Sequence, residues 1–168
     1  MRVVAGTARG RRLASPSGVD VRPTSDRVRE AVFNALHSRG AVVDADVLDL
    51  FAGTGALGIE ALSRGARRAV FVDRSAEAVD LVARNLRSCD LEDRARVVRA
   101  DGLRWLTTTD DRWDLVLLDP PYPFDGWADR WSGWPAVSTV RWLPNPTARS
   151  SRDPVGMANR AVGTGVPW

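Results

Sequence analysis

The stretch LDLFAGTGALG, residues 48–58, decides the fold of this chain. A short apolar run leads into a G-x-G-x-x-G pattern made by Gly53, Gly55 and Gly58, and a helical pattern follows at once. Asp73 comes twenty residues after Gly53, at the end of the next predicted strand. Glycines at this spacing allow a sharp strand-to-helix turn and a close approach of the backbone to a ligand, while the acid can accept both hydroxyls of a ribose. We therefore expect a nucleoside-binding loop here.

Short apolar runs alternate with helical segments on both sides of this loop. The expected strands cover residues 47–51, 69–72, 97–98 and 115–118, and the expected helices cover 56–63, 76–88 and 103–107. Strands separated by single helices imply right-handed crossovers and a parallel sheet that is covered on both faces. The prediction is an α/β fold with a doubly wound, mostly parallel, Rossmann-like sheet.

Two further elements are expected before this sheet. Residues 3–5 and 11–14 flank a glycine-containing turn and predict a small β-hairpin. The stretch 24–38 places apolar residues at helical spacing and predicts an amphipathic helix.

The charge of the chain is unevenly distributed. All 24 basic residues are arginine, and the net charge is +5 over residues 1–39, −6 over 40–129 and +4 over 130–168. We divide the chain at the same points into a basic N-terminal hairpin and helix, a central core that holds the glycine loop, and an atypical tail. A basic arm on an acidic body favours a polyanionic partner held by the arm. Arginine serving merely as the default surface cation is the simpler alternative.

Length and composition exclude several classes of protein. A chain of 168 residues with 44% apolar residues fits one soluble domain, expected to be a monomer. Its longest apolar runs are far shorter than the ~20 residues that a membrane span needs, so we expect a cytoplasmic protein without a membrane partner. Cys89 and His37 are the only residues of their types, which leaves no disulfide and no zinc ligand set.

The tail after Arg130 departs from the pattern before it. It holds five of the ten prolines and four of the seven tryptophans, and no period of 2 or 3.6 residues continues through it. We expect no strand from Ser132 onward and interpret the tail as irregular or disordered. A change of reading frame near Arg130 is a sharper hypothesis, because composition and periodicity break together there.

The charge around the glycine loop separates two nucleoside cofactors. Asp49 lies four residues before Gly53, where it would repel the pyrophosphate of a dinucleotide by ~1 to 4 kcal/mol. S-adenosylmethionine instead carries a sulfonium and an ammonium group, and a carboxylate attracts both. Asp101 follows the third strand and can accept a hydrogen bond from the adenine amine, cap the next helix, or do both.

The turn Asp119-Pro120-Pro121-Tyr122 follows the fourth expected strand. Two prolines stiffen this loop and lack N–H groups, so the Asp119 carboxylate and the Pro120 carbonyl present acceptors on a rigid frame. Such acceptors suit an exocyclic amine on a base, a poor nucleophile whose lone pair could then be directed toward a methyl donor. Tyr122 can stack on an extruded base. Alone, the turn could be an ordinary Asp-Pro turn.

Together these residues resemble the class I S-adenosylmethionine-dependent methyltransferases, and more closely the RsmD-type family, which methylates N2 of a guanine in bacterial 16S ribosomal RNA. The resemblance covers residues 1 to about 129 and is carried by RVVAGTARGRRL, RPTSDRVREAVFNAL, LDLFAGTGALGIEALSRGA, VFVDRS and LLDPPYPFDGW. The family normally finishes its sheet with an antiparallel strand pair, and no such pattern follows Arg130.

The resemblance implies a role for each group of site residues. The implied partner is 16S ribosomal RNA within the small subunit, without a metal. The target guanine would be held by Asp119, Pro120, Pro121 and Tyr122. The cofactor would be bound by Asp49, Phe51, Ala52, Gly53, Thr54, Gly55, Asp73, Arg74, Asp101 and Gly102. RNA would be bound by Arg2, Arg9, Arg11, Arg12 and Arg22.

Other functions remain open from the residues alone. The same turn would serve transfer to adenine N6 in DNA or to a glutamine side chain in a protein. A non-catalytic RNA-binding relative is an alternative from another class, and a dehydrogenase is disfavoured by Asp49.

Overall fold

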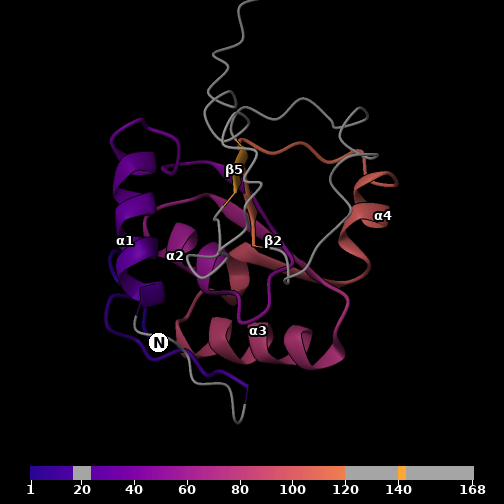
Figure 1. Ribbon diagram of the computed structural model, residues 1–168, viewed down its shortest axis with the longest axis horizontal. Helices are drawn as coiled ribbons and strands as arrows, with labels where there is room; N and C mark the ends of the chain where they lie inside the picture. Colours follow the sequence, from indigo (N-terminus) through magenta and orange to yellow (C-terminus); the bar gives the residue numbers. More distant parts are fainter. Residues whose placement is uncertain (17–23, 120–139, 143–168) are drawn as a thin grey trace, which may run out of the picture.

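The computed structural model describes residues 1–16, 24–119 and 140–142, and these form a three-layer α/β fold (Figure 1). The strands are β1 (Asp46–Leu50), β2 (Arg68–Asp73), β3 (Ala95–Arg99), β4 (Leu115–Leu118) and β5 (Val140–Trp142). The helices are α1 (Thr24–His37), α2 (Ala56–Ser63), α3 (Ala76–Ser88) and α4 (Gly102–Leu106), with a 3-10 turn η1 (Glu92–Arg94). Among these described segments, no helix is long and apolar enough to cross a bilayer.

The strands form one parallel sheet in the order β3-β2-β1-β4, with the short β5 added beside β4. The chain leaves β1 toward β2 on one side and later returns to β4 on the other, so the carboxyl ends of β1 and β4 border a topological switch point. Open α/β sheets bind their ligands in the crevice at such a point. The expected parallel, doubly wound sheet is confirmed.

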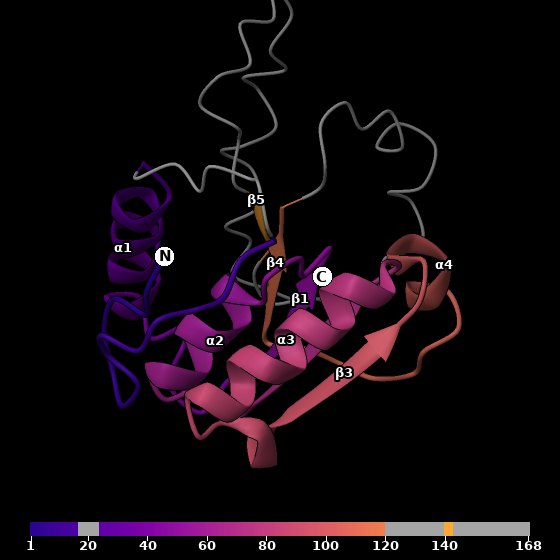
Figure 2. The same ribbon diagram turned by 90° about the horizontal axis from the view of Figure 1, so that it is seen from below.

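Alternate residues of the central strands fill two separate cores. Val47, Phe71 and Leu117 point into the core shared with α1, α2 and α3. Leu48 and Val116 face the other side, where the core includes residues of α4. Figure 2 shows α2 and α3 lying together across one face of the sheet, with α4 set apart from them. Burial on both faces explains why these strands read as continuous apolar runs rather than as alternating patterns.

The two strands of the predicted N-terminal β-hairpin are not formed. Residues 1–13 do fold back on themselves, but Arg2 and Arg12 form only an isolated antiparallel bridge and no strand. Beyond this bridge, the N–H groups of Val4 and Ala5 donate to the carboxylate of Glu60 in α2. We call residues 1–14 the N-terminal arm.

The tail prediction was also wrong at one place. Residues 140–142 form β5, which pairs in parallel with β4, although no strand was expected after Ser132. Three residues are too few for an alternating pattern to be visible in a sequence, and the pairing depends on the available edge of β4. The other tail residues lie outside the described ones.

Candidate active site at the carboxyl edge of the sheet

Asp49 occupies the centre of the site, near the end of β1. Its side chain is only 1% exposed, and its Oδ2 accepts a hydrogen bond of 2.9 Å from the backbone N–H of Gly58. Burial raises the pKa of Asp49 to about 8; the Gly58 hydrogen bond opposes this shift, and the charges of Asp119 and Asp73 add to it. Burial and the two neighbouring acids each disfavour the anionic form of this carboxyl. A cationic ligand would offset both effects, so the position suits such a ligand.

Gly58 permits this arrangement because α2 passes very close to β2. A Cβ atom at Gly58 would lie 2.3 Å from Cε1 of Phe71 and 3.1 Å from Oδ2 of Asp49. The third glycine of the motif therefore serves close helix–strand packing, as its position in the pattern predicts.

The loop between β1 and α2 is held in an unusual backbone conformation. Phe51 has φ 63°, and Gly53 and Gly55 have φ 54° and 76°. A bulky residue at positive φ is strained, and such strain persists where the surrounding structure fixes it, often beside a ligand. Ala52 is buried, and Thr54 is half-buried with its carbonyl bonded to a side chain of α3.

Asp73 braces this loop from the end of β2. Its Oδ2 accepts from the N–H of Gly53 and its Oδ1 from the N–H of Ser75, both at 2.9 Å. The side chain is half-buried, and each carboxylate oxygen retains a second lone pair, so the same residue can also accept ribose hydroxyls. The neighbouring Arg74 is exposed.

Asp101 and Gly102 lie at the start of α4. Asp101 is the N-cap, since its Oδ1 accepts from the N–H of Arg104 at 3.0 Å. The simpler of its two predicted roles is thus present, and its exposed carboxylate keeps acceptor capacity for a second one. A Cβ at Gly102 would lie 3.0 Å from Cδ1 of Leu50, which explains a glycine there.

Asp119 directly follows β4, the neighbour of β1 in the sheet. Asp49 is in register with Leu117, so Asp119 lies two residues further toward the carboxyl edge. Its side chain is exposed among the described residues, yet the protein around it removes enough water to raise the pKa of its carboxyl. Pro120, Pro121 and Tyr122 lie outside the described residues.

The predicted RNA-binding arginines fall into two groups. Arg2, Arg9 and Arg12 are exposed on the N-terminal arm. Arg11 instead contacts the end of α3: its Nη1 donates to the carbonyl of Ser88 at 3.0 Å, and its Nη2 lies 2.9 Å from the carboxylate of Asp90. Arg22 lies outside the described residues.

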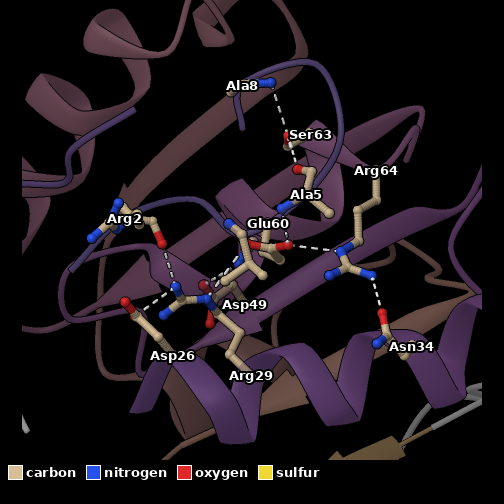
Figure 3. A network of polar contacts seen from close by, with 12 residues as sticks. Arg2, Ala5, Ala8, Asp26, Arg29, Asn34, Asp49, Glu60, Ser63 and Arg64 are labelled. Atoms are coloured by element: carbon tan, nitrogen blue, oxygen red, sulfur yellow. Dashed lines mark hydrogen bonds and ion pairs between the residues drawn. The ribbon is translucent and has the colours of Figure 1, made fainter. Parts of the chain in front are cut away.

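Sequence reasoning missed the polar network that attaches the arm to helices α1 and α2 (Figure 3). Glu60 is completely buried in α2, where it accepts from the backbone of the arm and pairs with Arg64 at 2.7 Å and Arg29 at 3.5 Å. Arg29 in α1 is itself 3% exposed and also donates to the backbone carbonyl of Arg2 and to Asp26. The available signal was a single acid within the otherwise apolar helix ALGIEALS.

Comparison with known proteins places the chain in a family. The profile of the family described as "Conserved hypothetical protein 95" matches residues 1–134. The chain belongs to this family. Among curated relatives, the proposed rRNA methyltransferase YlbH of Bacillus subtilis is 44% identical over 126 residues, which are 73% of this chain and 67% of that protein. Ribosomal RNA small subunit methyltransferase D of Escherichia coli is 39% identical over 122 residues, which are 73% of this chain and 60% of that protein.

A solved structure of a similar protein has the same fold as this chain. The proposed methyltransferase yhhF of Escherichia coli is 39% identical and superimposes with a TM-score of 0.63 over 72% of this chain and 64% of that one. The chain thus spans between three fifths and two thirds of the length of these relatives.

Proposed function

We propose that this chain transfers a methyl group from S-adenosylmethionine to the exocyclic N2 amine of a guanine in 16S ribosomal RNA, within the small ribosomal subunit in the cytoplasm. The observation that carries the proposal is the meeting of Asp49, Asp73 and Asp119 at the carboxyl edge, beside a strained glycine loop. The named activities of the relatives support the reaction and its substrate.

The residues present fit a cationic nucleoside cofactor. The buried carboxyl of Asp49 lies where a positive group would neutralise it, and a pyrophosphate there would add a further anion to three carboxyls. Asp73 would hold the ribose and Asp101 the adenine amine. The backbone of residues 51–55, with Arg74 and Gly102 beside it, would form the walls of the site.

S-adenosylmethionine supplies, when bound, a methyl group activated by a sulfonium sulfur. Asp119 would accept one hydrogen of the guanine amine and the Pro120 carbonyl the other, which turns the nitrogen lone pair toward the methyl group. The raised pKa of Asp119 makes its carboxylate a stronger base, suited to hold the proton that the amine releases. Pro121 would stiffen the loop and Tyr122 would stack on the base.

The division of labour follows the three segments of the chain. Residues 1–39 would bind RNA, residues 40–129 would bind the cofactor and perform the transfer, and residues 130–168 would form an atypical tail. The exposed Arg2, Arg9 and Arg12 support the first assignment.

The direct test is transfer of labelled methyl from S-adenosylmethionine to small ribosomal subunits that lack this modification, followed by mapping of the modified base. Label on N2 of a single guanine is the expected result. Label on DNA adenine or on a peptide glutamine, but not on the subunits, would contradict the proposed substrate. Binding of RNA and cofactor without any transfer would identify a non-catalytic relative.

The protonation of Asp49 predicts how cofactor affinity changes with pH. Below pH 8 the carboxyl is mostly protonated in the free protein, and a bound cation favours the carboxylate, so binding must release a proton. Affinity for S-adenosylmethionine should therefore rise with pH, by up to about tenfold per unit, and level off above about pH 8. Isothermal titration calorimetry from pH 6 to 9 measures this.

Asp49→Asn is the control for that measurement, because the ammonium group of the cofactor titrates equally with both proteins. The variant should bind more weakly at pH 9 and lack the rise below pH 8. Parallel curves for the two proteins would contradict a titrating Asp49.

From the structure of the N-terminal arm we predict which arginines contact RNA phosphates and so make RNA binding depend on salt. Arg2 and Arg12 oppose each other as a non-hydrogen-bonded pair, since Val3 donates to the Arg11 carbonyl and Leu13 to that of Met1. Like charges in such a pair repel, and within the described part of the chain neither guanidinium has an acidic partner. A phosphate between them would remove the repulsion.

Replacing Arg2 and Arg12 together by glutamine should therefore lower the slope of log affinity against log salt by about 2, as expected for two lost phosphate contacts. Arg11→Gln is the matched control: it should leave the slope nearly unchanged and lower the melting temperature. Filter binding at several salt concentrations distinguishes the variants, and equal slopes for wild type and double variant would refute the pairing.

A further inference from the structure

The side chain of Asn85 joins two segments that are far apart in the sequence. It lies in α3, is 1% exposed, and its Nδ2 donates to the carbonyl of Thr54 at 2.8 Å. The same Nδ2 donates to the carbonyl of Ala14 at 3.0 Å, while Oδ1 accepts from the Ala14 N–H at 2.8 Å. One buried amide is thus shared by the glycine loop and by the end of the N-terminal arm.

The bond to Thr54 adds a side-chain hydrogen bond to a peptide plane whose other end, the Gly55 N–H, donates to the Ala52 carbonyl at 2.7 Å in a turn. Thr54 lies between Gly53 and Gly55, both at positive φ, and glycine resists rotation of the neighbouring peptide planes less than any other residue. Asp73 fixes the loop at the N–H of Gly53, and Asn85 in α3 fixes it at the carbonyl of Thr54. Without Asn85, the orientation of the Thr54 peptide would have no side-chain support among the described residues.

The paired bonds to Ala14 hold the arm at its end in the same way. The arm carries Arg2 and Arg12. It is also attached through Glu60 and Ser63 of α2, through Arg29 of α1, and through the contacts of Arg11 with the end of α3. Because the same amide serves both segments, ordering one of them places Asn85 correctly for the other. A ligand that orders one segment therefore lowers the entropic cost of ordering the second.

We infer that Asn85 is a positioning residue that couples occupancy of the cofactor loop to docking of the N-terminal arm, so that cofactor and RNA strengthen each other's binding. The inference rests on the proposed function, since it takes the ligands of the two segments from it. Coupling of this kind is reciprocal, so it can be measured from either side.

The experiment compares the affinity of the full chain for small ribosomal subunits with and without saturating S-adenosylhomocysteine, by cosedimentation. We expect the nucleoside to tighten binding of the wild-type protein at least about fivefold, and to change that of Asn85→Ala by less than twofold. Asn85→Ala should also weaken the affinity for S-adenosylmethionine about tenfold, because it leaves the Thr54 carbonyl without its donor. The deciding quantity is the ratio of the affinities for small subunits with and without nucleoside. A merely structural loss would lower both affinities and leave this ratio unchanged.

Two further variants keep this test independent of stability. Leu86→Ala, at the next position of α3, removes a buried side chain that makes no hydrogen bond and should retain the wild-type ratio. Ala14→Pro removes the N–H that donates to Oδ1 of Asn85 and leaves the hydrogen bond to Thr54 in place. The ratio should therefore fall, while the affinity for the cofactor stays near that of wild type.

The outcomes separate the two proposals. A wild-type protein that binds neither S-adenosylmethionine nor the subunits contradicts the proposed function. If the wild-type protein binds both, two results overturn the coupling alone. One is a wild-type ratio of affinities with and without nucleoside near one. The other is a wild-type ratio that both Asn85→Ala and Ala14→Pro retain.

Discussion

Replacing Asp119 by alanine is expected to lower the rate of methyl transfer about 100- to 1,000-fold, while affinity for S-adenosylmethionine changes less than about threefold. Asp119 lies beyond the end of β4, at the switch point and outside the glycine loop. In the proposed mechanism, its removal takes away both the acceptor that would orient the amine and the base with a raised pKa that would hold the released proton. Single-turnover transfer and calorimetric cofactor titration measure the two quantities separately.

Two comparisons make this prediction specific. Asp119→Asn keeps an acceptor oxygen and loses the base, so its rate should lie between those of wild type and Asp119→Ala. Asp73→Ala should mainly weaken the cofactor affinity, since it removes the brace of Gly53 together with the proposed ribose ligand. An Asp119→Ala protein with wild-type activity would refute the proposed chemistry.

The second large effect is expected at Gly6, where alanine should detach the N-terminal arm and lower the free energy of unfolding by about 3 kcal/mol or more. Gly6 has φ 84°, and a Cβ there would lie 1.8 Å from the carbonyl oxygen of Ser63. The arm would have to move away from α2. That movement would withdraw the Val4 and Ala5 N–H groups from the buried carboxylate of Glu60.

Gly10→Ala is a closely matched control for this substitution. Gly10 has φ 83°, and nothing lies within 4 Å of the position its Cβ would take. It should cost only the strain of a left-handed alanine, about 1 to 2 kcal/mol. Urea unfolding of both variants isolates the contribution of arm docking, and equal losses of stability would show that the Ser63 contact is unimportant.

Much of the sheet was predictable because its signals are local. The central strands are buried on both faces and read as apolar runs, and α2 begins and ends at the predicted residues. The edge strand β3 was predicted only over residues 97–98 and in fact covers Ala95–Arg99, because an edge strand with partly exposed faces carries arginines that hide the pattern.

Features that depend on distant partners could not be predicted from the sequence. Glu60 and Val4 are 56 residues apart, and nothing in either neighbourhood indicates the other. Asn85 lies in an amphipathic helix, where an amide reads as a surface residue until its two backbone partners are brought to it. The position and charge of Asp49 in the sequence predict a role in cofactor binding, whereas its raised pKa follows from burial and from acids at the ends of two neighbouring strands.

The attachment of the N-terminal arm to α2 has a consequence for synthesis of the protein on the ribosome. The arm emerges before α2, and two partners of its backbone, Glu60 and Ser63, follow some 55 residues later. Until α2 has left the exit tunnel, the backbone N–H groups of Val4, Ala5 and Ala8 lack these partners, and the arm cannot dock on α2. Closing so long a loop carries an entropic cost that must be met before the contacts stabilise it. A segment that is made before α2 must therefore wait for α2 to reach its final place.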